Sequence, residues 1–311
     1  MTSVIEFTDA TKDYGSGKRI GPVSFSVESG EIMGFLGPNG SGKTTCIRLL
    51  LGLMRPSEGA VWIRGFDPVR EHRKAMRRVG YSPELPNIQT FLSPRELLSL
   101  VASELDLSRS EVKKEIKDSL EIVGLSDYEN TKVSKLSKGM VQRLSIAQAL
   151  IGSPDILVLD EPMIGLDPAG ASHFRSVFRE FAKERGGTIF LSSHIMSEVE
   201  ALCTSVCMIH NGRLLFKTKT EEVPANVLGS AFLIVEVEPI DERLIRELSE
   251  IDGVESVKTI AARALELSLR PGLEIRPVIS EKIVSSGAKL YSISYPNDLL
   301  ERAYLAALKK S

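Results

Sequence analysis

The sequence predicts a chain of two domains: an α/β domain over residues 1–220 and a smaller ferredoxin-like α+β domain over residues 221–311. Three observations lead to this prediction. The apolar stretch EIMGFLG runs through glycine into a helical pattern, which is how many α/β folds begin. A second apolar stretch, DILVLDEP, has the composition of a strand buried on both faces of a parallel sheet. After residue 220, strand and helix patterns alternate in the order β-α-β-β-α-β, which is typical of the ferredoxin-like fold.

A helical insert is predicted within the first domain, over about residues 85–152. Ser93 fits a helix N-cap, with Pro94 at the first helical position and Glu96 at the third, and this combination forms a capping box. Ser108 repeats the spacing at the start of a second helix, whose apolar residues fall on one face. A third helix follows the turn LSKGM.

Strands return after the insert, first in DILVLDEP at 155–162 and then in GTIFLSSH at 187–194. Phenylalanines at helical spacing predict a helix between them. Asn211 and Gly212 predict a type I′ hairpin. In the second domain, LIVEVEP and LELSLRP align as the openings of two similar units, so this half resembles one βαβ motif used twice.

The composition argues against several classes of protein. The formal net charge is −2, with 39 basic and 41 acidic residues, so no overall field attracts nucleic acid or an anionic membrane. Three cysteines argue against a disulfide framework and suit a reducing compartment. No run approaches the roughly 18 apolar residues of a membrane span. We therefore expect a cytoplasmic protein, with any membrane role exerted through a partner.

The segment GPNGSGKT matches the P-loop pattern G-x-x-x-x-G-K-[ST]. Backbone N–H groups of such a loop surround phosphates, while Lys43 reaches the β and γ oxygens and Thr44 offers its hydroxyl to Mg²⁺. A plain glycine turn is the alternative, but the position between a strand and a helix favours a nucleotide site. The predicted contacts are Gly37, Pro38, Asn39, Gly40, Ser41, Gly42, Lys43, Thr44 and Thr45.

Two carboxylates, Asp160 and Glu161, end the apolar strand 155–162. The carboxyl ends of strands in an open α/β sheet border the ligand crevice. Asp160 is therefore predicted to hold Mg²⁺, directly or through water, and Glu161 to orient or deprotonate the attacking water. An isolated pair of carboxylates would more often be a solvated strand end. The P-loop upstream makes a catalytic pair the favoured interpretation.

The turn LSKGM is a second candidate anion site. Ser137 and Gly139 lie where a helix begins, so free N–H groups and the helix dipole favour a negative charge there. Nothing next to this turn completes a catalytic site. The sequence thus contains two phosphate-binding turns that need not serve the same nucleotide.

In this order, GPNGSGKTT, LSKGM, ILVLDEP, GLDP and SSH resemble the ATP-binding cassette (ABC) family over about residues 1–217. The resemblance implies a P-loop NTPase with a RecA-like core, an antiparallel β subdomain and the helical insert, using ATP and Mg²⁺. It implies that Tyr14 stacks on adenine, that Asp167 belongs to the inter-subunit loop, and that His194 contacts the γ-phosphate. A surface tyrosine and a structural histidine are the plainer alternatives.

LSKGM corresponds to the family's signature, usually LSGGQ, which faces the nucleotide of a second subunit in a head-to-tail dimer. Because one cassette is present, the resemblance implies pairing with a copy of itself or with a relative. Lys138 and Met140 depart from the usual signature, which leaves Ser137 and Gly139 as the γ-phosphate contacts. Glu84 stands where many members have glutamine, and its carboxylate is expected to bind Mg²⁺. These variants and the C-terminal extension resemble the branch that serves ABC-2 type exporters.

The resulting hypothesis is an ATPase subunit that powers a membrane transporter, with export as the implied direction. It would bind a separate permease at the inner face of the cell membrane, through the helical insert and the loop around Glu84. The alternative is a soluble ABC-type ATPase that acts on nucleic acid or ribosomes, but the near-neutral charge gives no attraction for nucleic acid. For residues 221–311, a regulatory or dimer-bracing role and a structural appendage both stay open.

Overall fold

The computed structural model describes residues 2–15, 17–105 and 107–310. Contacts divide the chain into two compact units, residues 1–217 and 218–311, so the division falls a few residues before position 220. Among the described residues, no helix has the length and apolar content needed to cross a membrane.

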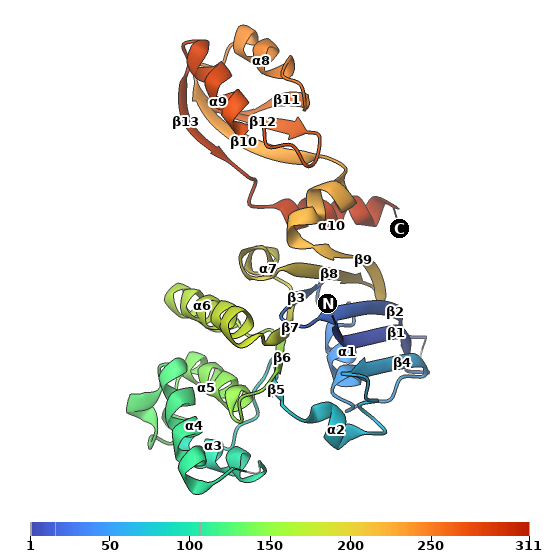
Figure 1. Ribbon diagram of the computed structural model, residues 1–311, viewed down its shortest axis with the longest axis vertical. Coiled ribbons are helices and arrows are strands. Elements are labelled where there is room, and N and C mark those ends of the chain that lie inside the picture. The colour runs from blue at the N-terminus through green and yellow to red at the C-terminus, as the bar shows by residue number, and fades with distance from the viewer. Residues whose placement is uncertain (1, 16, 106, 311) are drawn as a thin grey trace. The chain divides into compact units, whose positions relative to one another are not determined.

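The first unit begins with a three-stranded sheet in the order β2-β1-β4 (Figure 1). Its strands are β1 (Ser3–Asp13), β2 (Arg19–Glu28) and β4 (Glu58–Ile63), and both pairings are antiparallel. Burial alternates along β1 and β2 because one face packs on the core and the other is solvated. The antiparallel β subdomain implied by the family resemblance is therefore present.

A six-stranded sheet in the order β5-β6-β7-β3-β8-β9 forms the centre of this unit. Its strands are β5 (Val79–Ser82), β6 (Ile156–Asp160), β7 (Thr188–Ser193), β3 (Ile32–Leu36), β8 (Ser205–His210) and β9 (Arg213–Lys219). Every residue of β3, β6 and β7 is buried, as the apolar runs predict for parallel strands covered on both faces. Asn211 and Gly212 both have positive φ, as the predicted turn between β8 and β9 requires.

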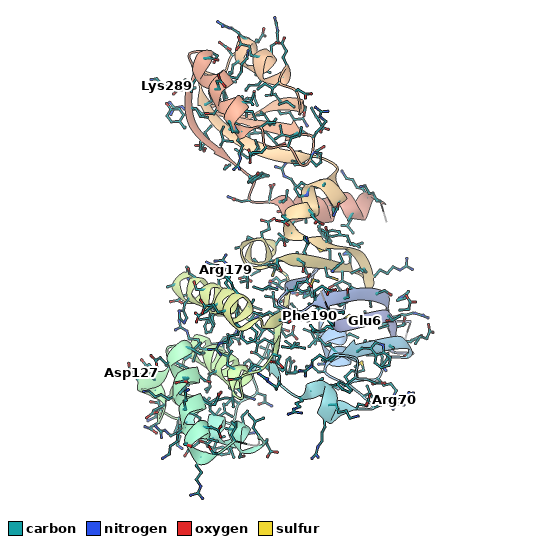
Figure 2. The ribbon with its side chains drawn as sticks, viewed as in Figure 1. Glu6, Arg70, Asp127, Arg179, Phe190 and Lys289 are labelled. Atoms are coloured by element: carbon teal, nitrogen blue, oxygen red, sulfur yellow. The ribbon has the colours of Figure 1, made fainter. Side chains whose placement is uncertain are left out.

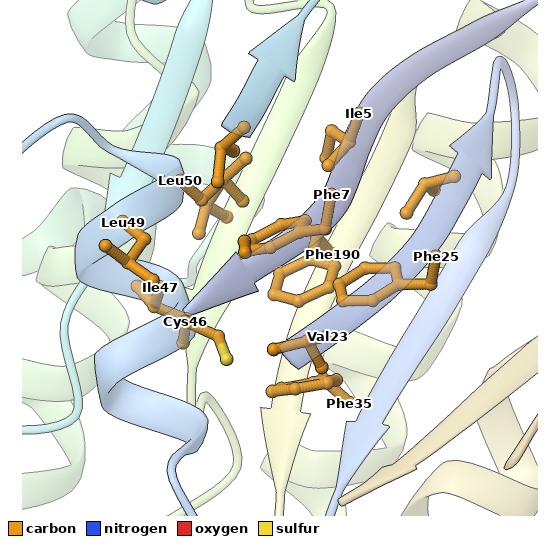
Figure 3. Packing of buried hydrophobic residues seen from close by; sticks show 14 of the residues in the cluster. Ile5, Phe7, Val23, Phe25, Phe35, Cys46, Ile47, Leu49, Leu50 and Phe190 are labelled. Atoms are coloured by element: carbon orange, nitrogen blue, oxygen red, sulfur yellow. The ribbon is translucent and has the colours of Figure 1, made fainter. Parts of the chain in front are cut away.

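Stacked phenylalanines join the two sheets. Phe7 of β1 lies 4.5 Å from Phe25 of β2, and Phe25 lies 6.0 Å from Phe190 of β7, measured between ring centroids (Figure 3). Aromatic rings offset in this way bury a large apolar area in a fixed geometry. Phe190 is enclosed between the layers, whereas charged side chains such as Arg70 and Asp127 project from the surface (Figure 2).

Helices cover the six-stranded sheet and form the insert of the first unit (Figure 1). The insert contains α3 (Pro94–Ser103), α4 (Arg109–Ile122) and α5 (Lys138–Leu150), with two short 3₁₀ turns between α4 and α5. Both predicted capping boxes, at Ser93 and Ser108, are confirmed. The remaining helices are α1 (Lys43–Leu50), α2 (His72–Met76), α6 (Pro168–Arg185) and α7 (Met196–Leu202).

The second unit has the strand order β11-β12-β10-β13, which with the chain order β-α-β-β-α-β is the ferredoxin-like arrangement. Leu233, Val235 and Leu267 belong to a buried core of its own. Its elements are η3 (Thr220–Glu222), η4 (Pro224–Leu228), β10 (Ala231–Glu238), α8 (Glu242–Ser249), β11 (Val254–Ala261), β12 (Ala264–Leu269), α9 (Arg276–Ser285), β13 (Lys289–Ser294) and α10 (Leu299–Lys310).

Candidate nucleotide-binding site

A cleft of about 580 Å³ opens beside the loop between β3 and α1. It lies at the carboxyl ends of parallel strands, where open α/β sheets bind their ligands. Most of the predicted site residues meet here, although they are far apart in the sequence. The lining residues are Tyr14, Lys18, Asn39, Gly40, Gly42, Lys43, Thr44, Thr45, Arg48, Glu84, Asp160 and Glu161.

The P-loop has the backbone of a phosphate cradle. Gly42 is the N-cap of α1 with φ of 116°, and no side chain caps this helix, so its first N–H groups are free to bind an anion. A Cβ on Gly37 would lie 2.3 Å from the carbonyl oxygen of Ile209, so this position requires glycine. The buried hydroxyl of Ser41 has no hydrogen-bond partner within the described chain. A phosphate oxygen would supply one.

Lys43 is held inside the loop. Its Nζ donates to the carbonyl oxygens of Gly37, at 2.7 Å, and Pro38, at 3.4 Å, and lies 3.4 Å from Oε1 of Glu161. Lys43 and Glu161 are both buried, so each charge depends on its partners for stability. An anionic ligand beside Lys43 would compete with Glu161 for the ammonium group. Phosphate binding is thereby coupled to the position of the predicted catalytic carboxylate.

Asp160 and Glu161 share Ser192, which lies opposite Asp160 on β7. The Ser192 hydroxyl donates to Oδ1 of Asp160 and accepts from the N–H of Glu161 at 3.0 Å. Glu161 has φ of 50°, a backbone conformation that costs a non-glycine residue about 1–3 kcal/mol. Burial raises the pKa of Asp160, and the carboxylates of Glu84 and Glu161 add to this rise, while the Ser192 hydrogen bond and Lys43 oppose it.

His194 contacts the same carboxylate. Its Nδ1 lies 2.9 Å from Oε2 of Glu161, and its backbone N–H donates to that oxygen at 3.3 Å. One ring nitrogen is thus engaged, which leaves Nε2 for a phosphate. Glu161 therefore connects Lys43 and His194, the two predicted phosphate contacts that flank it.

Tyr14 lies at the rim of the cleft, 41% exposed. Its hydroxyl is 2.9 Å from Oγ1 of Thr45 and 3.7 Å from the Met54 sulfur. The contact with Thr45 attaches the aromatic ring to α1, and the ring stays accessible to a base.

Two substitutions separate the role of the Tyr14 ring from the role of its hydroxyl. Tyr14→Ala should weaken ATP binding by roughly 1 to 3 kcal/mol, the range of base–aromatic stacking. Tyr14→Phe keeps the ring and removes the hydroxyl that anchors it, so we expect a loss of only about 0.5–1.5 kcal/mol. Titration with a fluorescent ATP analogue measures both. Equal affinity of Tyr14→Ala and the unsubstituted chain would contradict adenine stacking.

Ser137, Gly139 and Asp167 lie together at another place in the first unit. Ser137 caps α5 by accepting from the N–H of Met140 at 3.2 Å, and Asp167 caps α6 by accepting from the N–H of Gly170 at 2.8 Å. A Cβ on Gly139 would lie 2.9 Å from the carbonyl oxygen of Gly165, so the two turns pack backbone to backbone. None of these three predicted residues lines the cleft described above.

Comparison with known proteins identifies the class. A family model described as ABC transporter matches residues 20–164. The bacitracin transport ATP-binding protein BcrA of Bacillus licheniformis is 44% identical over 72% of this chain and 71% of its own length. The uncharacterized ABC transporter ATP-binding protein YhcH of Bacillus subtilis is 34% identical over 98% of this chain and 96% of its own length. The chain belongs to the ABC transporter family.

Two further ABC proteins extend the comparison. The Nod factor export ATP-binding protein I of Rhizobium etli is 34% identical over 73% of this chain and 72% of its own length. A solved structure of an ATP-binding subunit of an ABC transporter has a TM-score of 0.67 and 30% identity, covering 72% of this chain and 92% of that one. The predicted ABC cassette fold and the ATPase class are confirmed.

The oxygen ligands in the ABC cleft suit magnesium. Mg²⁺ prefers carboxylate, hydroxyl and water oxygens, and it completes its shell with substrate phosphates. Thr44, Glu84 and Asp160 line the cleft and offer a hydroxyl and two carboxylates. This donor set fits Mg²⁺ bound together with nucleotide phosphates.

Three residues of the ABC site were missed by the sequence analysis. Arg48 lines the cleft one helical turn after Thr44, so the period of α1 could have indicated it. Lys18 reaches the cleft from a loop and has no pattern that would reveal it. Ser192 lies two residues before His194 in the motif SSH, but its contact with Asp160 depends on the pairing of β6 with β7.

Proposed function

We propose that this chain is the ATPase subunit of an ABC exporter, and that two copies, or one copy and a related cassette, clamp ATP head to tail between them. The observation that carries the proposal is the separation of two phosphate-binding turns within one unit. The P-loop borders the cleft, while Ser137 and Gly139 lie outside it beside Asp167. A second cassette would place its own signature turn over this cleft and so complete the site.

The contacts of Glu161 suggest how ATP changes the site. The phosphates would take over Lys43 from Glu161, and His194 would reach the γ-phosphate through Nε2 while its Nδ1 stays on Glu161. Glu161, released from Lys43 and held by His194, would orient the attacking water and accept its proton. ATP would stabilise the closed dimer, and hydrolysis with product release would return the open form by population shift.

Mg²⁺ would be held by Thr44 and Asp160, with Glu84 as a further oxygen ligand. Bound there, the ion would neutralise charge on the phosphates. Lys43, the free N–H groups of α1 and the Ser41 hydroxyl would bind and orient the same phosphates.

The helical insert offers a docking surface for the membrane subunit. Leu85 and Phe91, in the loop after β5, are 71% and 66% exposed. Between α3 and α4 lies a groove of about 800 Å³ with an apolar floor that includes Ile116 and Leu120. Arg109, Lys113 and Lys117 line it along one face of α4, which suits an acidic, amphipathic segment. We therefore place the protein at the inner face of the membrane through its permease.

Charge reversal in the groove tests this docking. Arg109, Lys113 and Lys117 would be changed together to Glu, and the chain co-expressed with a multi-span membrane protein encoded beside its gene. We expect the membrane protein to stop co-purifying, while ATP-driven dimerisation of the isolated cassette is unchanged, since the groove lies away from the cleft.

The matched control carries the same change of charge at Arg73, Lys114 and Lys183, which are exposed and outside the groove. Co-purification should survive in this control. Equal recovery of the membrane protein with both triple variants would contradict the assignment of the groove.

The direction of transport and the domain division complete the proposal. Export is supported by the similarity to an ATP-binding protein of Nod factor export.

Residues 221–311 are proposed to be a separate accessory domain, supported by their own buried core and ferredoxin-like sheet. Removal of this domain should alter regulation or dimer stability and leave the P-loop intact.

A further inference from the structure

Two carboxylates lie near His194, and the sequence motifs explain one of them. Glu161, which lines the cleft, accepts a hydrogen bond from His194. The other is Glu198, half-buried in the first turn of α7 and close enough to His194 for their charges to interact. Its Oε2 lies 3.3 Å from the hydroxyl oxygen of Ser193, the residue that precedes His194.

The Ser193 side chain connects Glu198 with the backbone on both sides of His194. Its oxygen accepts from the N–H of Ile195 at 3.0 Å. A hydroxyl has a single proton to donate, and the Ser193 hydroxyl donates it in a hydrogen bond to Glu198. Within the described chain, the other acceptor near this hydroxyl is the Ile195 carbonyl, at a longer 3.5 Å. Because its proton points to Glu198, the Ser193 oxygen can direct a lone pair toward the N–H of Ile195.

We infer that Glu198 is a positioning residue of the ATPase site, which fixes through Ser193 the backbone that presents His194 to Glu161. The inference rests on the proposed roles of Glu161 and His194. His194 directs both its ring Nδ1 and its backbone N–H toward one carboxylate, so a small rotation of this backbone would weaken two hydrogen bonds together. Misplacement of a group by about 1 Å is enough to slow an enzymatic step by up to a hundredfold.

Burial, a hydrogen bond and neighbouring charges all act on the Glu198 carboxyl group. Burial raises the pKa of Glu198, the Ser193 hydrogen bond opposes this, Glu161 adds to the rise, and His194 and Arg175 lower it. The hydrogen bond from Ser193 needs an acceptor oxygen at position 198, which the side-chain amide of glutamine also supplies. The role assigned here therefore does not require the charge of Glu198.

Kinetics of two substitutions test the assignment. Glu198→Ala removes the acceptor, and we expect the turnover number for ATP to fall about tenfold with the Michaelis constant unchanged, since the P-loop is intact. Glu198→Gln keeps an acceptor oxygen and should restore turnover to within about twofold of the unsubstituted chain. Glu184→Ala, on an exposed face of α6, is the control for loss of a surface carboxylate.

The side-chain NMR signals of His194 give a readout that does not need hydrolysis. In the full chain, Glu198→Ala should shift the side-chain ¹⁵N resonances of His194, and Glu198→Gln should leave them close to their original values. Normal turnover in Glu198→Ala, or an equal loss in Glu198→Gln, would overturn the inference. If the unsubstituted chain hydrolyses no ATP, the proposed function fails, and the NMR comparison still decides whether Glu198 positions His194.

Discussion

Glu161→Gln should abolish ATP turnover and trap a dimer in the presence of ATP and Mg²⁺. The carboxylate is the proposed proton acceptor, and an amide cannot replace it, so we expect a loss of at least about a hundredfold. The substitution also removes the negative charge that lies 3.4 Å from Lys43 Nζ. ATP phosphates would then no longer compete with Glu161 for this ammonium group, so ATP binding should be kept or strengthened. Phosphate release and light scattering measure the two effects.

Glu198→Gln is the matched control for this substitution, because it makes the same chemical change at a second carboxylate near His194 and should keep turnover. A monomer in light scattering for Glu161→Gln with ATP and Mg²⁺ would contradict the two-site dimer. Full turnover in Glu161→Gln would contradict the role of this residue as the base.

Gly139→Asp should prevent ATP-driven dimerisation and leave ATP binding to the single chain nearly unchanged. The new carboxylate would face the γ-phosphate of the partner subunit, where like charges repel. Its Cβ would also lie 2.9 Å from the Gly165 carbonyl oxygen, which would displace the turn that carries Asp167. The P-loop and its cleft are elsewhere in the unit. We expect ATPase activity to fall by about a hundredfold or more.

Ser110→Asp adds the same charge at the exposed start of α4 and serves as the control, since an acidic residue is tolerated in the first turn of a helix. Analytical ultracentrifugation with ATP gives the state of association, and a fluorescent nucleotide gives the affinity. Loss of ATP affinity in Gly139→Asp alone would mean that this turn acts on its own chain's nucleotide.

Local features of the fold were predictable from the sequence because each depends on residues close together in the chain. The capping boxes at Ser93 and Ser108 and the turn at Asn211 and Gly212 are of this kind. The apolar runs likewise revealed the buried parallel strands. The antiparallel subdomain was implied only by the family resemblance, because its strands come from distant segments that no local pattern pairs.

The candidate site divides in the same way. Lys43 and Asp160 were found because a motif surrounds each of them. The shared hydrogen bonds of Ser192 and the link from Glu198 through Ser193 were not found, since they arise only when strands and helices pack. The hydroxyl contact of Tyr14 with Thr45 is a further case, because it joins a loop to a helix.

The central claim, that each P-loop is completed by the signature turn of another subunit, is tested most directly by mixing two defective chains. One carries Lys43→Ala, the other Gly139→Asp, and both carry Glu161→Gln so that bound ATP is not hydrolysed. Each chain alone forms no closed dimer, and the open site of a single chain should release its labelled ATP during rapid gel filtration. A mixed dimer pairs the intact P-loop of the second chain with the intact signature turn of the first, so the mixture should retain labelled ATP in a dimer. Retention in the mixture no greater than the sum of the two separate chains would contradict the claim.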